Sequence, residues 1–147
     1  MNIKFFNTKD NINDPSLITI WSLIHFWSGI QTAIIFKYYN LPDKTNLIIS
    51  FIIHSIYELN DYYESHIRKV QPKDEYYTDS IQNCIGDAIV NLFGIIIFLK
   101  FSKQKPTKQQ LISSIIITIL LFIFLMHFYA DGWTWAYHQT LRKLGLL

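Results

Sequence analysis

Charged residues and cysteine are scarce in this chain of 147 residues. Charged residues make up 16% of it, the net charge is +2, and Cys84 is the single cysteine. One cysteine excludes a disulfide within the chain and a cysteine cluster around a metal. So small a net charge, with no basic stripe interleaved with aromatic residues, excludes nucleic acid as a partner. No motif identifies a protein partner.

Hydrophobic residues, in contrast, make up 50% of the chain and gather in blocks. Three blocks, at 17–36, 81–101 and 111–130, have the roughly 20 residues that a helix needs to cross about 30 Å of hydrocarbon. The block at 47–59 is shorter, and it crosses only if the polar residues at 58–63 extend its helix among protein neighbours. The first block is longer than the apolar run of a signal peptide and lacks a small-x-small cleavage site, which argues against a cleaved signal.

These blocks predict an all-α fold, an integral membrane four-helix bundle. We expect a single transmembrane domain over residues 1–147, multi-pass, in a membrane that the sequence leaves unidentified. Asp14 or Ser16 is expected to cap the first helix. Lysine and arginine number seven on one side and six on the other, so the bias that usually sets orientation gives none here. The helices are expected at about 16–38, 46–63, 79–101 and 109–130, followed by an amphipathic tail at 133–147.

Ionisable side chains gather on one side of the predicted bundle. With alternating crossings, that side holds the starts of the first and third helices and the ends of the second and fourth. His25 lies about 12 Å inside the start of the first helix, on a stripe with Ser22 and Gly29. The other three helices place polar residues at helical spacing on one face each: His54, Glu58 and Asp61; Asp79, Asn83 and Asp87; His127 and Asp131. Together the polar faces of the four helices predict a polar pocket that opens to one side.

Ionisable side chains are energetically unfavourable inside a membrane, and for this reason their presence there suggests a function. A charged side chain near the middle of a bilayer is disfavoured by about 2.5 kcal/mol or more, so it normally faces a bundle interior or water. The plainer interpretation is polar contact between helices. The candidate catalytic residues are Glu58, Asp79, Asn83 and Asp87. The candidate metal ligands are Glu58, Asp79, Asp87, His54 and His25, and the candidate substrate-binding residues are Arg68, His127 and Asp131.

Several of these candidates also fit a structural role. His25 and His54 fit the interior of a helix bundle as well as they fit a ligand or a base. Arg68, His127 and Asp131 also fit solvated positions near the membrane interface. The sequence leaves both interpretations open.

The cofactor that this set of residues suits is a divalent metal. Carboxylate oxygens favour magnesium or manganese, and imidazole shifts the preference towards zinc or iron. The sequence is therefore compatible with a membrane-embedded, metal-dependent hydrolase or transferase that acts on a polar lipid headgroup. It is also compatible with a binder of lipids or ions, or a proton-coupled carrier, without catalysis, and with a structural membrane subunit. Membrane lipids are the expected partner in each case.

The order of the polar residues along the chain follows a family pattern. A histidine in one helix, His25, is followed by a glutamate ending the next, Glu58, and by a loop arginine, Arg68. Asp79-x3-Asn83-x2-Gly86 then opens the third helix. Over roughly residues 17–94 this order resembles the VanZ-like family of small membrane proteins.

Two features qualify the resemblance and one extends it. Asp61 stands where the VanZ-like pattern has glutamine, and the interval from Arg68 to Asp79 is longer than usual. Tyr77 and Asp79, followed by Asp87, are similar to the Tyr-x-Asp-x3-Asp opening of a related four-helix bacterial family. The resemblance implies a membrane protein linked to the cell envelope and, in one branch, to resistance against glycopeptide antibiotics.

Overall fold

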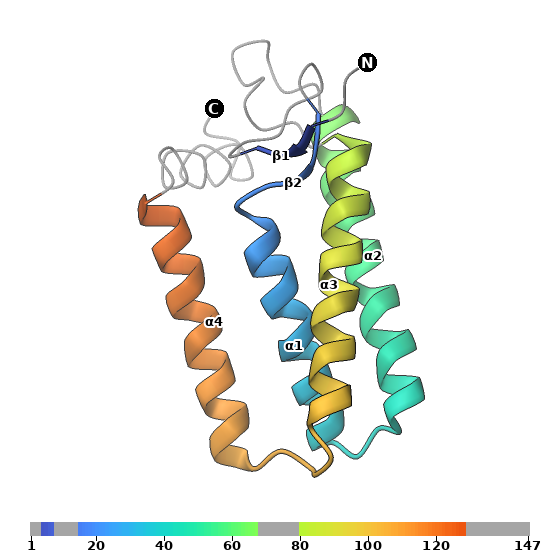
Figure 1. The fold of residues 1–147 in the computed structure, drawn as a ribbon, viewed down its shortest axis with the longest axis vertical. Helices are drawn as coiled ribbons and strands as arrows, with labels where there is room; N and C mark the ends of the chain where they lie inside the picture. Colours follow the sequence, from blue (N-terminus) through green and yellow to red (C-terminus); the bar gives the residue numbers. More distant parts are fainter. Residues whose placement is uncertain (1–3, 8–14, 68–79, 129–147) are drawn as a thin grey trace.

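The computed structural model describes residues 4–7, 15–67 and 80–128, which form four helices and two short strands (Figure 1). This confirms an all-α fold. The strands pair in parallel, with Lys4 opposite Ser16 and Phe6 opposite Ile18. The elements are β1 (Lys4–Phe6), β2 (Ser16–Ile18), α1 (Ser22–Tyr38), α2 (Asp43–Ile67), α3 (Ile81–Phe101) and α4 (Lys108–Phe128).

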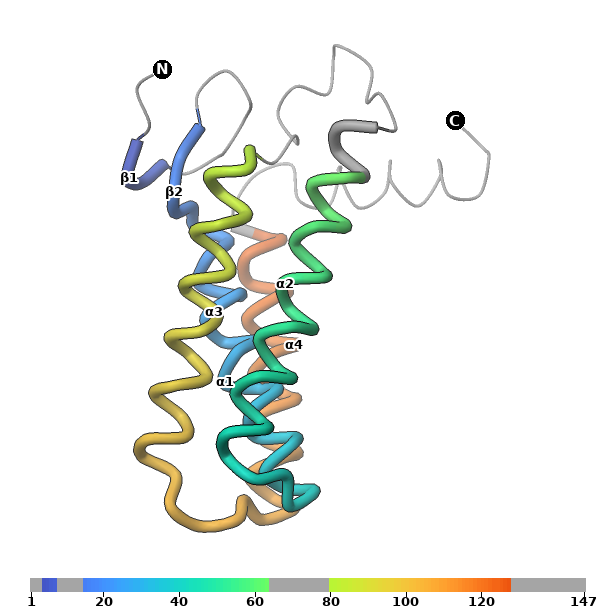
Figure 2. Tube along the Cα trace, turned by 90° about the vertical axis from the view of Figure 1, so that its right-hand side faces the viewer, coloured from blue at the N-terminus to red at the C-terminus, as the bar shows by residue number. Residues whose placement is uncertain are grey.

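The helices run alternately up and down, with α1 at the centre of the bundle. Figure 1 shows α1 between α4 on one side and α2 and α3 on the other, and α1 contacts all three. In the view of Figure 2, α3 and α2 lie on opposite sides of α1. The turns from α1 to α2 and from α3 to α4 lie at the same end of the bundle. The starts of α1 and α3 and the ends of α2 and α4 therefore share the opposite end, as the sequence predicts.

Glycines bring α1 and α3 into backbone contact. A Cβ atom added at Gly29 would stand 2.2 Å from the carbonyl oxygen of Asn91, and one added at Gly94 would stand 2.1 Å from that of Phe26. Real Cβ atoms essentially never come closer than 3.0 Å to such a neighbour. The two helices can pack this closely because no side chain stands between them at these positions.

The start of the first helix differs from the prediction. The helix begins at Ser22 and not at residue 16, and its N-cap is Trp21, which makes no side-chain capping bond. Ser16 lies in β2, so it does not cap the helix, and Asp14 lies outside the described residues. The reason is strand pairing: the Pro15 carbonyl accepts from the Lys4 amide at 3.1 Å, which keeps this segment extended.

The second helix is longer than predicted and so includes the polar residues that the sequence placed at its end. It has 25 residues, Asp43–Ile67, against the expected 46–63. The side chain of Asn46 ties it to α1 by donating to the Ala33 carbonyl at 2.9 Å. Glu58 therefore lies well within the helix. The predicted tail at 133–147 lies outside the described residues.

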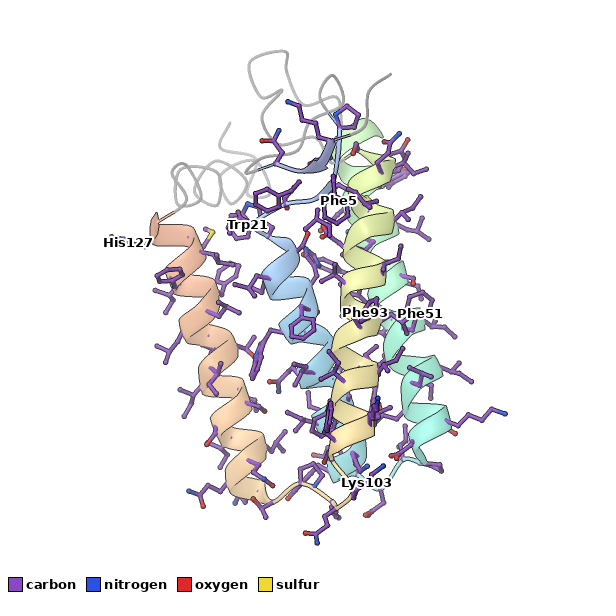
Figure 3. The ribbon with its side chains drawn as sticks, viewed as in Figure 1. Phe5, Trp21, Phe51, Phe93, Lys103 and His127 are labelled. Carbon is purple, nitrogen blue, oxygen red and sulfur yellow. The ribbon has the colours of Figure 1, made fainter. Side chains whose placement is uncertain are left out.

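Polar residues face inwards and apolar residues face outwards on α2 and α3. On α2, the residues at successive intervals of four are buried and all polar: Asn46, Ser50, His54 and Glu58. Its exposed side is apolar and includes Ile48, Ile52, Ile56 and Leu59. On α3, Asn83, Asp87 and Asn91 are buried, whereas Ile85, Ile89 and Phe93 are exposed (Figure 3). This distribution is the reverse of that in a soluble helix bundle.

Two helices, α3 and α4, are long and apolar enough to cross a membrane. Buried uncharged polar residues also occur towards the turn end of the bundle, among them Asn46 on α2 and Ser114 on α4. Nearer the middle of the bundle, the part-buried Trp27 indole donates to Thr118 Oγ1 at 2.8 Å, and Thr118 Oγ1 donates to Gln31 Oε1 at 3.0 Å. The one-sided gathering thus applies to the ionisable side chains and not to every polar one.

Candidate functional site

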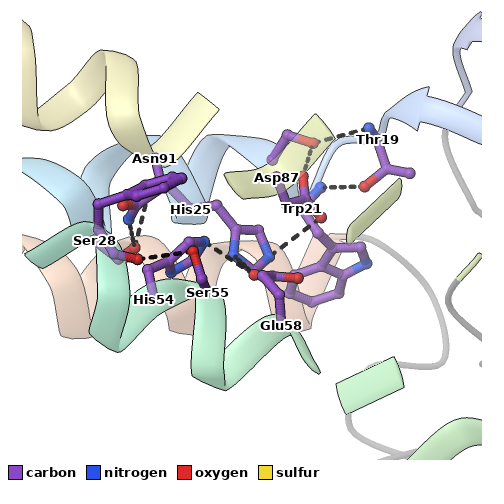
Figure 4. Close-up of polar contacts among 11 residues, drawn as sticks. Thr19, Trp21, His25, Ser28, His54, Ser55, Glu58, Asp87 and Asn91 are labelled. Atoms are coloured by element: carbon purple, nitrogen blue, oxygen red, sulfur yellow. Dashed lines mark hydrogen bonds and ion pairs between the residues drawn. The ribbon is translucent and has the colours of Figure 1, made fainter. Parts of the chain in front are cut away.

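Two histidines and a glutamate from neighbouring helices meet near the strand end of the bundle (Figure 4). His25 comes from α1, and its Nδ1 lies 2.9 Å from Glu58 Oε1. His54 lies one turn before Glu58 on α2, and its Nε2 is 3.0 Å from the same oxygen. His54 and Glu58 are buried, with 8% and 7% of their side chains exposed, and His25 is nearly so at 14%. One carboxylate oxygen therefore receives two imidazole nitrogens.

These close contacts are not all hydrogen bonds. Among the described residues, neither His54 Nε2 nor Glu58 Oε1 has a partner in hydrogen-bonding geometry, although the two atoms are 3.0 Å apart. The two imidazole rings meet edge to face, with centroids 5.2 Å apart, and the His54 ring stacks on Tyr57 at 6.2 Å. Ring packing holds the histidines, and their contact with Glu58 is mainly electrostatic.

Asp87 extends the cluster from α2 through α1 to α3. Its Oδ2 lies 3.6 Å from Nε2 of His25, on the side of the ring away from Glu58. The Ser22 hydroxyl donates to the other oxygen of Asp87 and accepts from the Thr19 amide at 3.0 Å. The two carboxylates thus flank the His25 ring, and Asp87 is anchored to the start of α1.

Asn91 fixes α1 against α3 one turn beyond Asp87. Its side-chain amide donates to the His25 carbonyl at 3.0 Å and to Ser28 Oγ at 2.9 Å. Sequence reasoning missed both Asn91 and Ser28. Asn91 carried a signal, because it continues the spacing of four residues that links Asn83 and Asp87.

The other candidates lie apart from this cluster or outside the described chain. Asn83 is buried one turn before Asp87, and its side-chain Nδ2 has no hydrogen-bond partner among the described residues. His127 is exposed at the end of α4 (Figure 3). Asp79, Arg68 and Asp131 lie outside the described residues. Of the substrate-binding candidates, the structure therefore places His127 alone, and it places it away from the cluster.

The cluster lies closer to a helix end than the sequence predicted. Because α1 begins at Ser22, His25 is three residues, or about 4.5 Å, from the helix start and not about 12 Å. One ligand atom from each of His25, His54 and Glu58 falls within 4.8 Å of the others, a spacing that allows all three to bind one metal ion. Of the five predicted metal ligands, three converge here and Asp87 stands behind one of them. We call the four residues His25, His54, Glu58 and Asp87 the polar centre.

Comparison of the chain with models of protein families, with characterised proteins and with solved structures gives no match. The resemblance to the VanZ-like family therefore stays a prediction. Of the six positions that match that pattern, the structure describes four, namely His25, Glu58, Asn83 and Gly86.

Proposed function

We propose that the chain is an integral membrane protein in which all four helices cross the bilayer. The observation that supports this best is α2, whose buried face is polar from Asn46 to Glu58 and whose exposed face is apolar. In water, that arrangement would leave an extended apolar surface uncovered. In a bilayer, the same surface faces lipid while the polar side chains face protein. The lengths of α1 and α2, 17 and 25 residues, correspond to about 26 and 38 Å and suit a crossing.

We infer that the polar centre binds the polar headgroup of a membrane lipid and hydrolyses or transfers it with the help of a divalent metal. The position of His25 near the start of α1 supports this, because headgroups lie at the membrane surface and not in its middle. Glu58 and the two histidines provide ligands for a cation. When bound, such a cation polarises a phosphoryl or carbonyl group and activates a water molecule.

The surrounding residues have supporting roles in this proposal. Asp87, anchored by Ser22, holds the His25 ring from the side opposite Glu58. The side-chain amide of Asn83, one turn nearer the start of α3, is free among the described residues to donate to a headgroup oxygen. The arrangement therefore combines a cation site with a donor for an anionic group.

The test is headgroup release or exchange by purified protein in vesicles of phosphatidylethanolamine and phosphatidylglycerol, followed by mass spectrometry. Glu58→Gln removes the charge and keeps the shape of the side chain, so we expect turnover to fall about 100-fold or more. Asp43→Asn is the matched control, because it removes an exposed carboxylate from the opposite end of the same helix. Its turnover should equal that of the wild type.

Three results would contradict the proposal. Wild-type protein without turnover in metal-supplemented vesicles refutes catalysis on these lipids. Proton-dependent flux without headgroup release identifies a carrier instead. Variants of Glu58 that lose stability but keep full activity identify a structural role.

A further inference from the structure

The three converging atoms of the polar centre have the spacing of ligands around one metal ion. His25 Nδ1 and His54 Nε2 lie 2.9 and 3.0 Å from Glu58 Oε1. Ligands held about 2.0–2.2 Å from a tetrahedral ion stand about 3.4 Å apart. Outward movements of about half an ångström, within the range of side-chain rotation, would therefore admit an ion between them.

The missing hydrogen bond supports the same conclusion. Among the described residues, His54 Nε2 and Glu58 Oε1 are buried and close, yet they are not in hydrogen-bonding geometry. A buried polar atom left in this state costs free energy, so native structures usually provide a partner. A cation between the two atoms would satisfy both at once.

Asp87 lies next to the ring nitrogen of His25 that faces away from Glu58. A histidine that binds a metal through one ring nitrogen usually presents the other N–H to a carboxylate, which fixes its tautomer and orientation. His25 faces Glu58 with Nδ1 and Asp87 with Nε2, at 3.6 Å. With a metal ion bound at Nδ1, the ring would carry its proton on Nε2, which faces Asp87. Ser22 holds Asp87 in this position.

We propose that His25 Nδ1, His54 Nε2 and the Glu58 carboxylate bind one divalent transition-metal ion of the zinc type, and that Asp87 is a positioning residue for His25. Two imidazoles and one carboxylate favour a transition metal over magnesium or calcium, which prefer oxygen ligands only. Three protein ligands leave a fourth position open, as in catalytic zinc sites. The ion would also neutralise the negative charge of the two buried carboxylates.

This ligand set deepens the proposed function, because it names the metal class and the ligands of the same centre. The two proposals can fail separately. Metal binding without headgroup turnover leaves this proposal standing and removes the proposed function. Headgroup turnover by fully metal-free protein removes the metal site, and of the proposed function it leaves only the turnover of headgroups.

The experiment is titration of chelator-treated, detergent-purified protein with Zn²⁺, and with Co²⁺ as a spectroscopic probe. We expect one equivalent to bind, a visible Co²⁺ spectrum of tetrahedral type that Zn²⁺ abolishes, and no competition from millimolar Mg²⁺. Glu58→Gln and His54→Ala should lose this binding. Asp87→Asn should weaken it about 10–100-fold while keeping the spectrum, as expected of a positioning residue.

Two controls keep the result interpretable. Asp43→Asn removes an exposed carboxylate elsewhere on α2 and should bind Zn²⁺ like the wild type. Zn²⁺ should also raise the unfolding temperature of the wild type and not that of Glu58→Gln. Because glutamine keeps the shape of the glutamate side chain, Glu58→Gln still tests the site if His54→Ala fails to fold. Wild type that binds neither ion, Mg²⁺ that competes equally, or Glu58→Gln that binds as tightly as the wild type would overturn the metal site. Asp87→Asn with unchanged affinity would overturn the role of Asp87.

Discussion

Replacing Gly94 with alanine tests how closely α1 and α3 approach each other. The new Cβ would stand 2.1 Å from the Phe26 carbonyl oxygen, where ordinary contact begins at 3.4 Å. The difference, 3.4 minus 2.1, requires the two backbones to separate locally by about 1.3 Å. Such a shift would stretch the 3.0 Å bond from Asn91 to the His25 carbonyl beyond hydrogen-bonding distance.

The expected sign of the effect makes this substitution informative. Alanine is a better helix former than glycine by about 0.8–1.0 kcal/mol, so without a clash Gly94→Ala would stabilise α3. Overpacking of a tight interface costs about 1–3 kcal/mol, and a lost interhelical hydrogen bond adds about 0.6 kcal/mol. We therefore expect net destabilisation of roughly 1–3 kcal/mol.

Equilibrium unfolding in mixed detergent micelles, followed by helical circular dichroism, measures this change. Ile97→Ala is the control, because Ile97 lies on the exposed side of the same helix and should change stability by no more than about 0.5 kcal/mol. A Gly94→Ala variant as stable as the wild type, or more stable, would refute the close approach of α1 and α3.

Two further predictions concern hydrogen bonds near the starts of α2 and α4. Asn46→Ala removes the donor to the Ala33 carbonyl, so the free energy of unfolding should fall by about 0.6–1.7 kcal/mol, whereas the exposed Asn60→Ala should leave it unchanged; equal values for both variants would contradict the contact. Thr107→Ala breaks a reciprocal cap, in which the Thr107 amide donates to Gln110 Oε1 and the Gln110 amide donates to Thr107 Oγ1. This variant should lower the free energy of unfolding by about 1 kcal/mol and speed amide hydrogen exchange in the first turn of α4. Unchanged exchange there would count against the cap.

The helices could be predicted from the sequence because their signals are local. The apolar blocks extend over enough residues to define α3 and α4 to within about two residues, since a helix satisfies its own backbone. Because successive helices run in opposite directions, the sequence also predicted which helix ends lie on the same side of the bundle. The start of α1 could not be predicted in this way, because strand pairing between residues 4–6 and 16–18 is a contact between separate segments.

The polar centre, too, could be predicted from the sequence only in part. Spacing by four residues along α2 determined that His54 and Glu58 share a face, and the same rule linked Asn83 to Asp87 on α3. Periodicity within one helix cannot say which face of the next helix it meets. Only the tertiary structure brought His25 between Glu58 and Asp87, because the glycine contacts of α1 with α3 set how deeply and at what rotation these helices pack. The sequence thus determined which residues are available, and the packing of α1 decided which of them meet.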